Sequence, residues 1–503
     1  MRDISANGAL PFCCAKMQND YYSKTNKNIK TTKQNVKREP TFPQEQLICK
    51  NYQPTFQRKW LEHKSWGAVV DPITKEVSFK LFTFPDVKQV EVVVHKAQTN
   101  AEKIFNLINR GKGVFETENK IPQTEVSNGD RYSYRITKAD GSIDTVKDPY
   151  SFKQEEILGD STIYDHSLYQ WNDNNWYDKS NTKRISRLAN KENNLTSLRE
   201  ANIYEIHIGT LMENGTFEKA KEKLKYIEEQ GYNTIEIMPV ENTYSFNLGY
   251  DGVDKFAPSH IYGNPDELKS LIDAAHGQGL NVIIDMVPNH LGTDGASLHR
   301  TGPYLNGGNA FGSAFNFEHE NSRYVRDFII NAALNWIDNY HCDGLRLDAT
   351  KHMGSDYTMQ QLAAEVHYHK PDAFLIAEDF RMYDQNIRDS LLKPLPVDSS
   401  ENEHLYTIEH IDKNIDMIDA SGGIYRIPAE ALQLKRFGYD SEWDCFTSEQ
   451  IRRNLFGHFN YHDNISENVD LWEIHNSVFS GQNRVKYIES HDSMCEFCGN
   501  RYI

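Results

Sequence analysis

Residues 264–290 read NPDELKSLIDAAHGQGLNVIIDMVPNH, an amphipathic helix followed by a short strand that is apolar almost throughout. The same alternation of helix and strand runs along the chain from about residue 200. Four other strands of this kind are ANIYEIHIG (201–209), YNTIEIMPV (232–240), CDGLRLDA (342–349) and AFLIAEDF (373–380). Apolar strands that alternate with helices indicate a parallel sheet buried on both faces.

Two later stretches extend the pattern. RFGYDSEW (436–443) and VKYIESHD (485–492) have the composition of a sixth and a seventh strand. Seven units favour a (β/α)8 barrel over an open, doubly wound sheet, which is the alternative on pattern alone. No glycine-rich phosphate fingerprint follows the first strand, and this counts against a dinucleotide-binding domain.

The N-terminal half has a different pattern. EVSFKLFTF (76–84), QVEVVVHKA (89–97) and DRYSYRITKA (130–139) alternate apolar with polar residues and predict antiparallel strands. We therefore expect three parts. They are a disordered, polar tail at 1–50, an antiparallel β-sandwich at 55–165, which by the family resemblance described below is of the glycan-binding type, and the barrel at 195–503. We expect the sandwich to pack on the barrel rather than to bind glycan.

Composition restricts the partners. A net charge of −17 argues against nucleic acid and anionic membranes, and favours a neutral substrate such as a sugar. No apolar run reaches the ~20 residues that span a bilayer, and the N-terminus has no signal-peptide pattern. Seven cysteines in 503 residues are too few and too irregular for a disulfide framework, so we expect reduced thiols and a cytoplasmic location. The oligomeric state is left open.

Polar residues gather where the predicted strands end, which is where a barrel builds its active site. They are Asp285, Asn289 and His290 after the third strand, Arg346 and Asp348 on the fourth, Glu378 and Asp379 on the fifth, and Glu489, His491 and Asp492 on the seventh. A single carboxylate in such a place is usually a solvated loop residue. Carboxylates and histidines at four strand ends predict one catalytic rim.

Two of these carboxylates fit different chemical roles. Arg346 and Asp348 stand two residues apart on a strand, so they point to the same side. A guanidinium there favours an ionised Asp348, which suits a nucleophile. Glu378 follows an apolar run, where burial favours the protonated acid that a general acid needs. Such a pair is what a retaining glycosidase requires. The alternative is a buried ion pair that only organises the barrel.

The motifs DMVPNH (285–290), GLRLDATKH (344–352), IAED (376–379) and ESHD (489–492) resemble, in order, the four signature regions of glycoside hydrolase family 13, the α-amylase family. NLGYDGVDKFAP (247–258) resembles that family's substrate-contacting segment. The resemblance implies that Asp348 is the nucleophile, Glu378 the acid/base and Asp492 the third, transition-state-stabilising carboxylate. It also implies that Tyr250, His290, Arg346, His491 and His352 form the sugar-binding surroundings, and that no cofactor or metal is needed.

Within the family, the chain is most similar to the malto-oligosyltrehalose trehalohydrolases, so the resemblance implies hydrolysis of α-1,4-glucans. The 1,4-α-glucan branching enzymes are the first alternative. An inactive, glycan-binding barrel is the second, because only eleven residues follow Asp492 and we expect the eighth barrel unit to be missing. His207 is expected to be structural. The Cys495/Cys498 pair is expected to be two ordinary thiols, since a zinc site needs four ligands.

Overall fold

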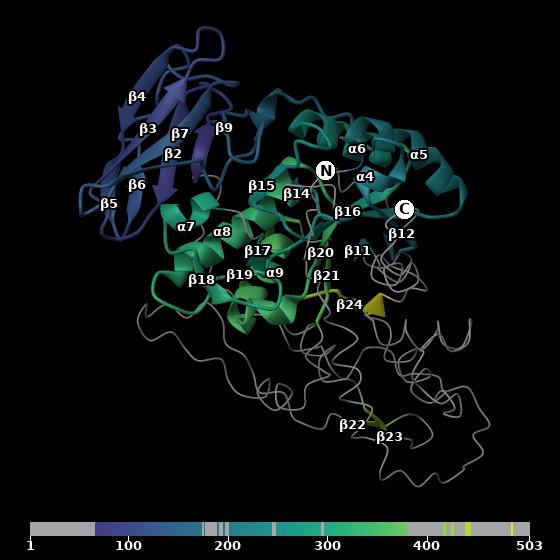
Figure 1. The fold of residues 1–503 in the computed structure, drawn as a ribbon. Helices are drawn as coiled ribbons and strands as arrows, with labels where there is room; N and C mark the ends of the chain where they lie inside the picture. The colour runs from purple at the N-terminus through teal and green to yellow at the C-terminus, as the bar shows by residue number, and fades with distance from the viewer. Residues whose placement is uncertain are drawn as a thin grey trace, which may run out of the picture.

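The computed structural model describes residues 66–173, 176, 189–190, 195–196, 201–243, 248–292, 296–370, 372–379, 416–418, 424–426, 438–443 and 484–485. Figure 1 shows a purple-to-blue β-rich region beside a teal-to-green region in which helices flank a central sheet. The predicted tail at 1–50, the residues His491 and Asp492, and the Cys495/Cys498 pair lie outside the described residues.

The β-rich region consists of two antiparallel sheets. One has the order β1 (Gly67–Val70), β2 (Val77–Phe82), β6 (Val114–Glu116), β5 (Ile108–Gly111). The other has the order β4 (Glu102–Asn106), β3 (Gln89–His95), β7 (Arg131–Thr137), β8 (Ile143–Val146), with β9 (Ser161–Thr162) paired to β7. Alternate residues of β2, β3 and β7 form one buried cluster between the sheets. This confirms the β-sandwich that the alternating pattern predicts.

Seven strands form a parallel sheet in which spatial order equals chain order. They are β12 (Ile203–Ile206), β13 (Thr234–Ile237), β16 (Asn281–Met286), β20 (Gly344–Leu347), β21 (Phe374–Ala377), β24 (Ser441–Trp443) and β25 (Arg484–Val485). Six of them lie within predicted strands, and β25 overlaps the predicted seventh strand at Val485. Sequential parallel pairing is the topology of a (β/α) barrel. The absence of an eighth unit stays a prediction.

The main helices are α5 (Phe217–Glu229), α6 (Pro265–Gly277), α8 (Ser322–Leu334) and α9 (Asp356–His369). The start of α6 is fixed locally, because Asn264 and Glu267 form a reciprocal capping box around Pro265. The shorter elements are α4 (Ile208–Leu211), α7 (Ala296–Thr301), η1 (His166–Leu168), η3 (Asn335–Asn339), η4 (Thr350–Met353), β10 (Ala189–Asn190), β11 (Leu195–Thr196), β14 (Glu241–Asn242), β15 (Asp254–Pro258), β17 (His290–Leu291), β18 (Leu305–Gly308), β19 (Ser313–Phe315), β22 (Asp416–Ile418) and β23 (Ile424–Arg426).

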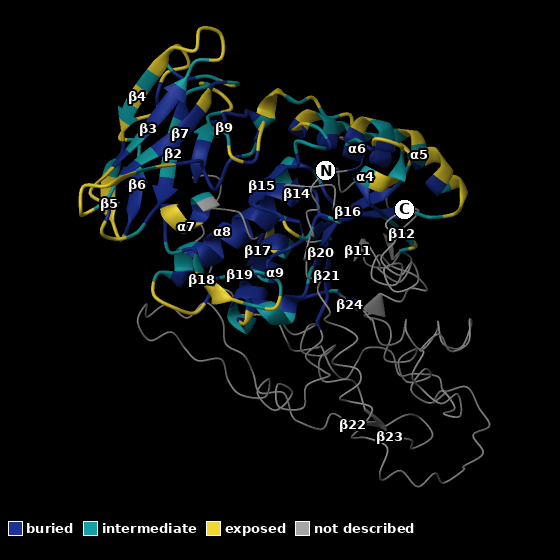
Figure 2. Ribbon diagram, viewed as in Figure 1, coloured by how far each residue is buried: buried dark blue, intermediate teal, exposed yellow. Residues whose placement is uncertain are grey.

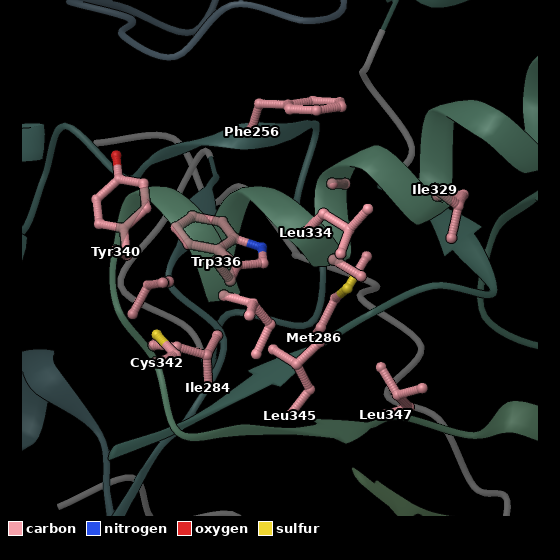
Figure 3. Close-up of a cluster of buried hydrophobic side chains, with 14 of the residues drawn as sticks. Phe256, Ile284, Met286, Ile329, Leu334, Trp336, Tyr340, Cys342, Leu345 and Leu347 are labelled. Atoms are coloured by element: carbon pink, nitrogen blue, oxygen red, sulfur yellow. The ribbon is translucent and has the colours of Figure 1, made fainter. Parts of the chain in front are cut away.

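The barrel core lies between these helices and the sheet, and Figure 2 shows β16, β20 and β21 as buried. In Figure 3, Leu334 and Trp336, at the junction of α8 and η3, lie close to Ile284 and Leu345 of the strands β16 and β20. Burial of one such side chain stabilises the fold by roughly 1.5–3 kcal/mol. This packing fixes two of the three strands whose ends carry the polar residues described below. No helix within the described ranges is both long enough and apolar enough to cross a membrane.

The segment after β9 ties the sandwich to helix α6. Tyr164 donates a hydrogen bond to Asp266 over 2.5 Å. Further along, Asp173 lies 2.9 Å from Nδ1 of His276, whose Nε2 lies 3.1 Å from Asp343. Although burial opposes it, these two carboxylates raise the pKa of His276 above its usual value. The contacts connect the two regions on the α6 side of the barrel.

Candidate active site

Three parallel strands bring their polar ends together. In the sheet, Asp285 of β16 stands opposite Arg346 of β20. Asp348 follows β20, and its backbone N donates to Met286 O over 3.0 Å. Glu378 follows β21, and its backbone N donates to Leu347 O over 3.0 Å. Residues separated by almost 100 positions in the sequence therefore share one edge of the sheet.

The guanidinium of Arg346 joins the three carboxylates. Its Nη1 lies 3.0 Å from both oxygens of Asp285 and 2.9 Å from Oδ1 of Asp348. Its Nη2 lies 2.8 Å from Oε2 of Glu378. The side chains of Arg346 and Asp285 are fully buried, while 13% of Asp348 and 6% of Glu378 remain exposed. The two carboxylates with proposed chemical roles are thus the ones that solvent or a substrate can reach.

Charge and aromatic rings surround this guanidinium. Burial disfavours its positive form, but Asp285 and Glu378 outweigh burial and raise the pKa of Arg346 well above its usual value. The ring of Trp443 lies 5.2 Å from Cζ, and that of Tyr250 lies 5.9 Å away. Both distances suit cation–π attraction. Arg346 is therefore a fixed positive centre for the three strand ends.

Tyr250 is held by the same group. Its hydroxyl donates to Oδ2 of Asp285 over 2.6 Å. Burial, and then the charge of Asp285, raise the pKa of Tyr250 well above its usual value, so the phenol stays neutral. The hydrogen bond fixes the orientation of the ring. The predicted stacking of this ring on a sugar stays a prediction.

Asn289 holds Asp348 and orients His290. Its side-chain Nδ2 donates to the backbone O of Asp348 over 2.8 Å and to Oδ2 over 3.1 Å. Its Oδ1 must therefore accept from Nδ1 of His290, 2.6 Å away. Burial first, and then the positive charge of Lys255, lower the pKa of His290 to about 4. At neutral pH the ring is therefore uncharged, with one N–H donor and one acceptor nitrogen.

The surroundings of Glu378 differ from the sequence-based expectation. An apolar strand does precede it, but its Oε2 also accepts from the backbone N of Ala349 over 3.0 Å and lies against Arg346. Ala349 adopts a left-handed conformation with φ 40° and ψ 50°. This conformation turns the chain directly after Asp348 so that it contacts the fifth strand. The contact between the two strand ends was missed in the sequence because it depends on backbone geometry.

His352 lies beside an aromatic ring that sequence reasoning also missed. The ring of Phe311, in the connection between β18 and β19, has its centre 4.9 Å from His352 and 5.8 Å from His290. Burial first, and then Lys351, lower the pKa of His352. His207 bonds Thr210 and Tyr262 through its two ring nitrogens, as expected of a structural residue. No sequence pattern marks Phe311, since it stands in a glycine-rich loop.

The predicted residues are thus placed together as far as they are described. Asp285, Asn289, Tyr250, His290, Arg346, Asp348 and Glu378 form one contact network, and His352 joins it through Phe311. His491 and Asp492 lie outside the described residues. Within the described ranges, no group of three or more His, Cys, Asp or Glu side chains is arranged to hold a metal ion.

Known families match both regions of the chain. Residues 65–151 match carbohydrate-binding module 48, the isoamylase N-terminal domain, and residues 162–304 match the α-amylase catalytic domain. The second match covers the barrel up to the strand that carries Asp285 and the loop beyond His290. Over these stretches the chain is similar to the α-amylase family, glycoside hydrolase family 13. The prediction made from the four motifs is confirmed at this level.

Individual relatives agree with this family-13 assignment. A malto-oligosyltrehalose trehalohydrolase of Deinococcus radiodurans is 33% identical over 281 residues, 54% of this chain and 42% of the relative. A 1,4-α-glucan branching enzyme of Geobacillus stearothermophilus is 32% identical over 283 residues, 50% of this chain and 42% of the relative. The chain thus spans less than half the length of these curated relatives.

A solved structure supports the fold of the chain. A pullulanase from Anoxybacillus sp. LM18-11, crystallised with maltotriose, superposes with a TM-score of 0.62 over 88% of this chain and 63% of that one, at 18% identity. Such a low identity speaks to the fold alone. Together with the seven sequential strands, it confirms the predicted architecture of a barrel-type parallel sheet preceded by a sandwich.

Proposed function

We propose that this chain is a retaining glycoside hydrolase that acts on α-1,4-glucans by double displacement, with Asp348 as nucleophile and Glu378 as acid/base. The observation that carries the proposal is the single guanidinium of Arg346, which contacts both carboxylates at 2.9 and 2.8 Å. That arrangement brings two partly accessible carboxylates to one point. Retaining enzymes need such a pair at a separation of about 5–5.5 Å.

The first chemical step breaks the bond between the anomeric carbon and the leaving sugar oxygen. An oxygen of Asp348 forms a bond to that carbon, while Glu378 gives its proton to the leaving oxygen. Arg346 and Asn289 hold the attacking carboxylate in one orientation through the contacts described above. In the second step Glu378 takes a proton from the incoming water, whose oxygen forms a bond to the anomeric carbon as the bond to Asp348 breaks.

The remaining predicted residues have binding roles in this proposal. Neutral His290 is proposed to hydrogen-bond a sugar hydroxyl, and Tyr250 presents a ring held by Asp285. His352 lies against Phe311, which also contacts His290, and is proposed as a further sugar contact. Asp492 and His491 are proposed as the third carboxylate and its neighbour, on their motif alone.

The substrate is proposed to be a malto-oligosaccharide that ends in trehalose, as the similarity to the trehalohydrolases suggests. Branching activity is the alternative, because a relative of that kind is almost equally similar over a comparable share of the chain. Hydrolysis and transfer differ only in whether water or a sugar hydroxyl opens the covalent intermediate. The residues that hold Asp348 and Glu378 serve both outcomes.

A binding protein without activity is the second alternative. Among the described residues of the sandwich, the large exposed apolar side chains are all aliphatic: Ile73, Ile104, Ile143 and Leu158. Sugar rings are commonly stacked on exposed aromatic rings, so this surface supports packing on the barrel as the role of the sandwich. The binding alternative therefore rests on the barrel itself.

One product analysis separates the three possibilities. The purified chain is incubated with maltodextrin, glycogen and malto-oligosyltrehalose, and the products are separated by chromatography. Free trehalose supports the trehalohydrolase, and new α-1,6 branches support the branching enzyme. If no product forms but the chain is retarded on a glucan affinity gel, the enzyme proposal is wrong and the binding alternative is right.

The nucleophile has its own test. Asp348→Asn keeps the size of the side chain but not its nucleophilic charge, so turnover is expected to fall by roughly 10³-fold or more. Far-UV circular dichroism of the variant should match that of the wild type. Near-normal turnover in the variant would show that Asp348 is not the nucleophile.

We also propose a cytosolic location, which the few cysteines support, and the division into a tail at 1–50, a sandwich at 55–165 and a barrel at 195–503. The net charge of −17 supports a neutral glucan as partner rather than nucleic acid or an anionic membrane. Limited proteolysis followed by mass spectrometry tests the division. Cleavage concentrated near residues 50 and 165–195 is expected, whereas cuts within the sandwich would contradict it.

A further inference from the structure

The turn that follows the proposed nucleophile reaches across to the proposed acid/base. Ala349 has a positive φ of 40°, which is uncommon for a residue other than glycine and is usually kept where the surroundings require it. The turn points two successive backbone N–H groups at Glu378. That of Ala349 donates to Oε2 over 3.0 Å, and that of Thr350 donates to the backbone O over 2.8 Å.

The side chain of Thr350 adds a second connection. Its Oγ1 lies 3.0 Å from the backbone O of Glu378 and 3.0 Å from Oδ2 of Asp379. A hydroxyl has one hydrogen to donate, so the two acceptors share it in a three-centre bond. Thr350 is 1% exposed and Asp379 is 2% exposed, so bulk water does not compete for this hydrogen.

These contacts leave Glu378 little freedom. Its backbone N is bound to Leu347 O over 3.0 Å, and its backbone O is held by Thr350. Oε2 faces two donors, Ala349 N and Arg346 Nη2. A proton on Oε2 would point at those donors. The proton that a general acid delivers is therefore carried on Oε1, whose direction depends on how firmly the backbone and Oε2 are fixed.

We propose that Thr350 and Asp379 are positioning residues that aim the carboxyl group of Glu378 at the leaving oxygen, an inference that rests on the function proposed above. Neither residue contacts the reacting atoms. Thr350 acts through its bonds to the backbone of Glu378. Asp379 acts by holding the Thr350 hydroxyl and by fixing the peptide that follows Glu378.

The variant Thr350→Val tests this proposal, because valine has nearly the same shape but no hydroxyl. Two substrates are compared through kcat/KM, which reports on the first chemical step. Maltopentaose has a sugar oxygen as leaving group, and that oxygen must be protonated by Glu378. In α-maltosyl fluoride the bond from carbon to fluorine breaks, the bond to Asp348 forms, and fluoride leaves as an anion without a proton.

We expect Thr350→Val to lose about 10-fold or more in kcat/KM on maltopentaose, since a misplaced catalytic group can cost about 100-fold. On α-maltosyl fluoride we expect a change of less than about 2-fold, because general-acid help, which contributes roughly 10²–10⁴-fold, is not used there. Thr350→Ser keeps the hydroxyl and is expected to restore activity on maltopentaose. Fluoride release is followed with an ion-selective electrode.

Thr358→Val is the matched control. Thr358 is also fully buried, and its hydroxyl donates to Ser355 Oγ over 2.9 Å at the start of α9. Thr358→Val removes a buried threonine hydroxyl that lies away from the strand ends, so this variant should cleave both substrates as fast as the wild type does. Asp379→Asn serves as the second test variant if Thr350→Val does not fold, with the same difference between substrates expected.

Each outcome decides the proposal. Equal losses on both substrates would mean that Thr350 has only a structural role, and unchanged activity on both would mean that it has none in positioning. Either result overturns the inference while leaving the proposed function in place. A wild-type chain that cleaves neither substrate would overturn the proposed function itself, and the inference with it.

Discussion

Removal of the Arg346 charge should be one of the most damaging single changes in the barrel. One fully buried guanidinium contacts Asp285, Asp348 and Glu378 at 2.8 to 3.0 Å. Two unit charges 4 Å apart attract by about 4 kcal/mol at an effective dielectric constant of 20. Loss of one partner from a buried pair costs about 3–5 kcal/mol. Because Arg346→Met leaves three carboxylates without their cation, we expect about 5 kcal/mol, the upper end of that range.

A second substitution separates charge from packing. Asp285→Asn alone should destabilise the protein by about 2–3 kcal/mol, since a charged hydrogen bond to buried Arg346 is weakened. In the Arg346→Met background the same change removes one of three uncompensated charges and should stabilise the protein instead. The two residues are therefore expected to couple by about 3 kcal/mol, the largest value usual for residues in contact.

The assay is urea unfolding of the wild type, both single variants and the double variant, followed by far-UV circular dichroism at pH 7 and pH 5. The cost of Arg346→Met should be smaller at pH 5, because carboxylates without a cation bind protons more readily and so lose their repulsion. Additive costs in the double variant would refute this reasoning. So would a cost of Arg346→Met that is equal at the two pH values.

Two further predictions concern the segment on α6 and the loop beside the histidines. Burial opposes ionisation of Asp173, but hydrogen bonds from His276 and His341 prevail and lower its pKa from 3.8 to about 2. Because its pKa is lower in the folded state, Asp173 stabilises the fold fully at pH values above its unfolded-state pKa, and this stabilisation is lost as the pH falls toward the folded-state pKa. Asp173→Asn should therefore reduce the free energy of unfolding by about 2 kcal/mol at pH 6 and by clearly less at pH 3. Urea unfolding at both pH values checks this, and an equal cost would contradict it. Phe311→Ala should let water reach His290, whose burial lowers its pKa to about 4, and so move that pKa toward the usual 6.5. The fall of kcat/KM on the acid side of its pH profile should then occur at higher pH. If it does not move, the Phe311 ring does not keep water from His290.

Local pattern was enough to find the strands. Each apolar run, such as NVIIDMV at 281–287, became a strand of the parallel sheet, because a strand buried on both faces can carry few polar residues. The polar residues that follow each run are brought together by sequential parallel pairing. The placement of Asp285, Arg346, Asp348 and Glu378 at one edge therefore follows from the sequence once the fold class is known.

The contacts between strand ends could not be predicted from the local sequence pattern. The left-handed turn at Ala349, which joins the fourth strand end to Glu378, depends on a backbone conformation that alanine seldom adopts. Phe311 reaches His290 and His352 from a loop that has no periodic pattern. Asp173 and His276 meet across 103 positions of the chain. Such long-range contacts are fixed by tertiary packing, which no local window of sequence contains.

The most direct test of the proposed mechanism is covalent trapping of the nucleophile. A maltosyl fluoride with a second fluorine on C5 is incubated with the chain, since the added fluorine slows the second step by destabilising the oxocarbenium-like transition state. The protein is then digested and its peptides are sequenced by mass spectrometry. We predict one maltosyl adduct, attached to Asp348 in the peptide that contains GLRLDATKH (344–352). An adduct on Glu378 or on another carboxylate, or turnover that yields the inverted anomer without any adduct, would contradict the account.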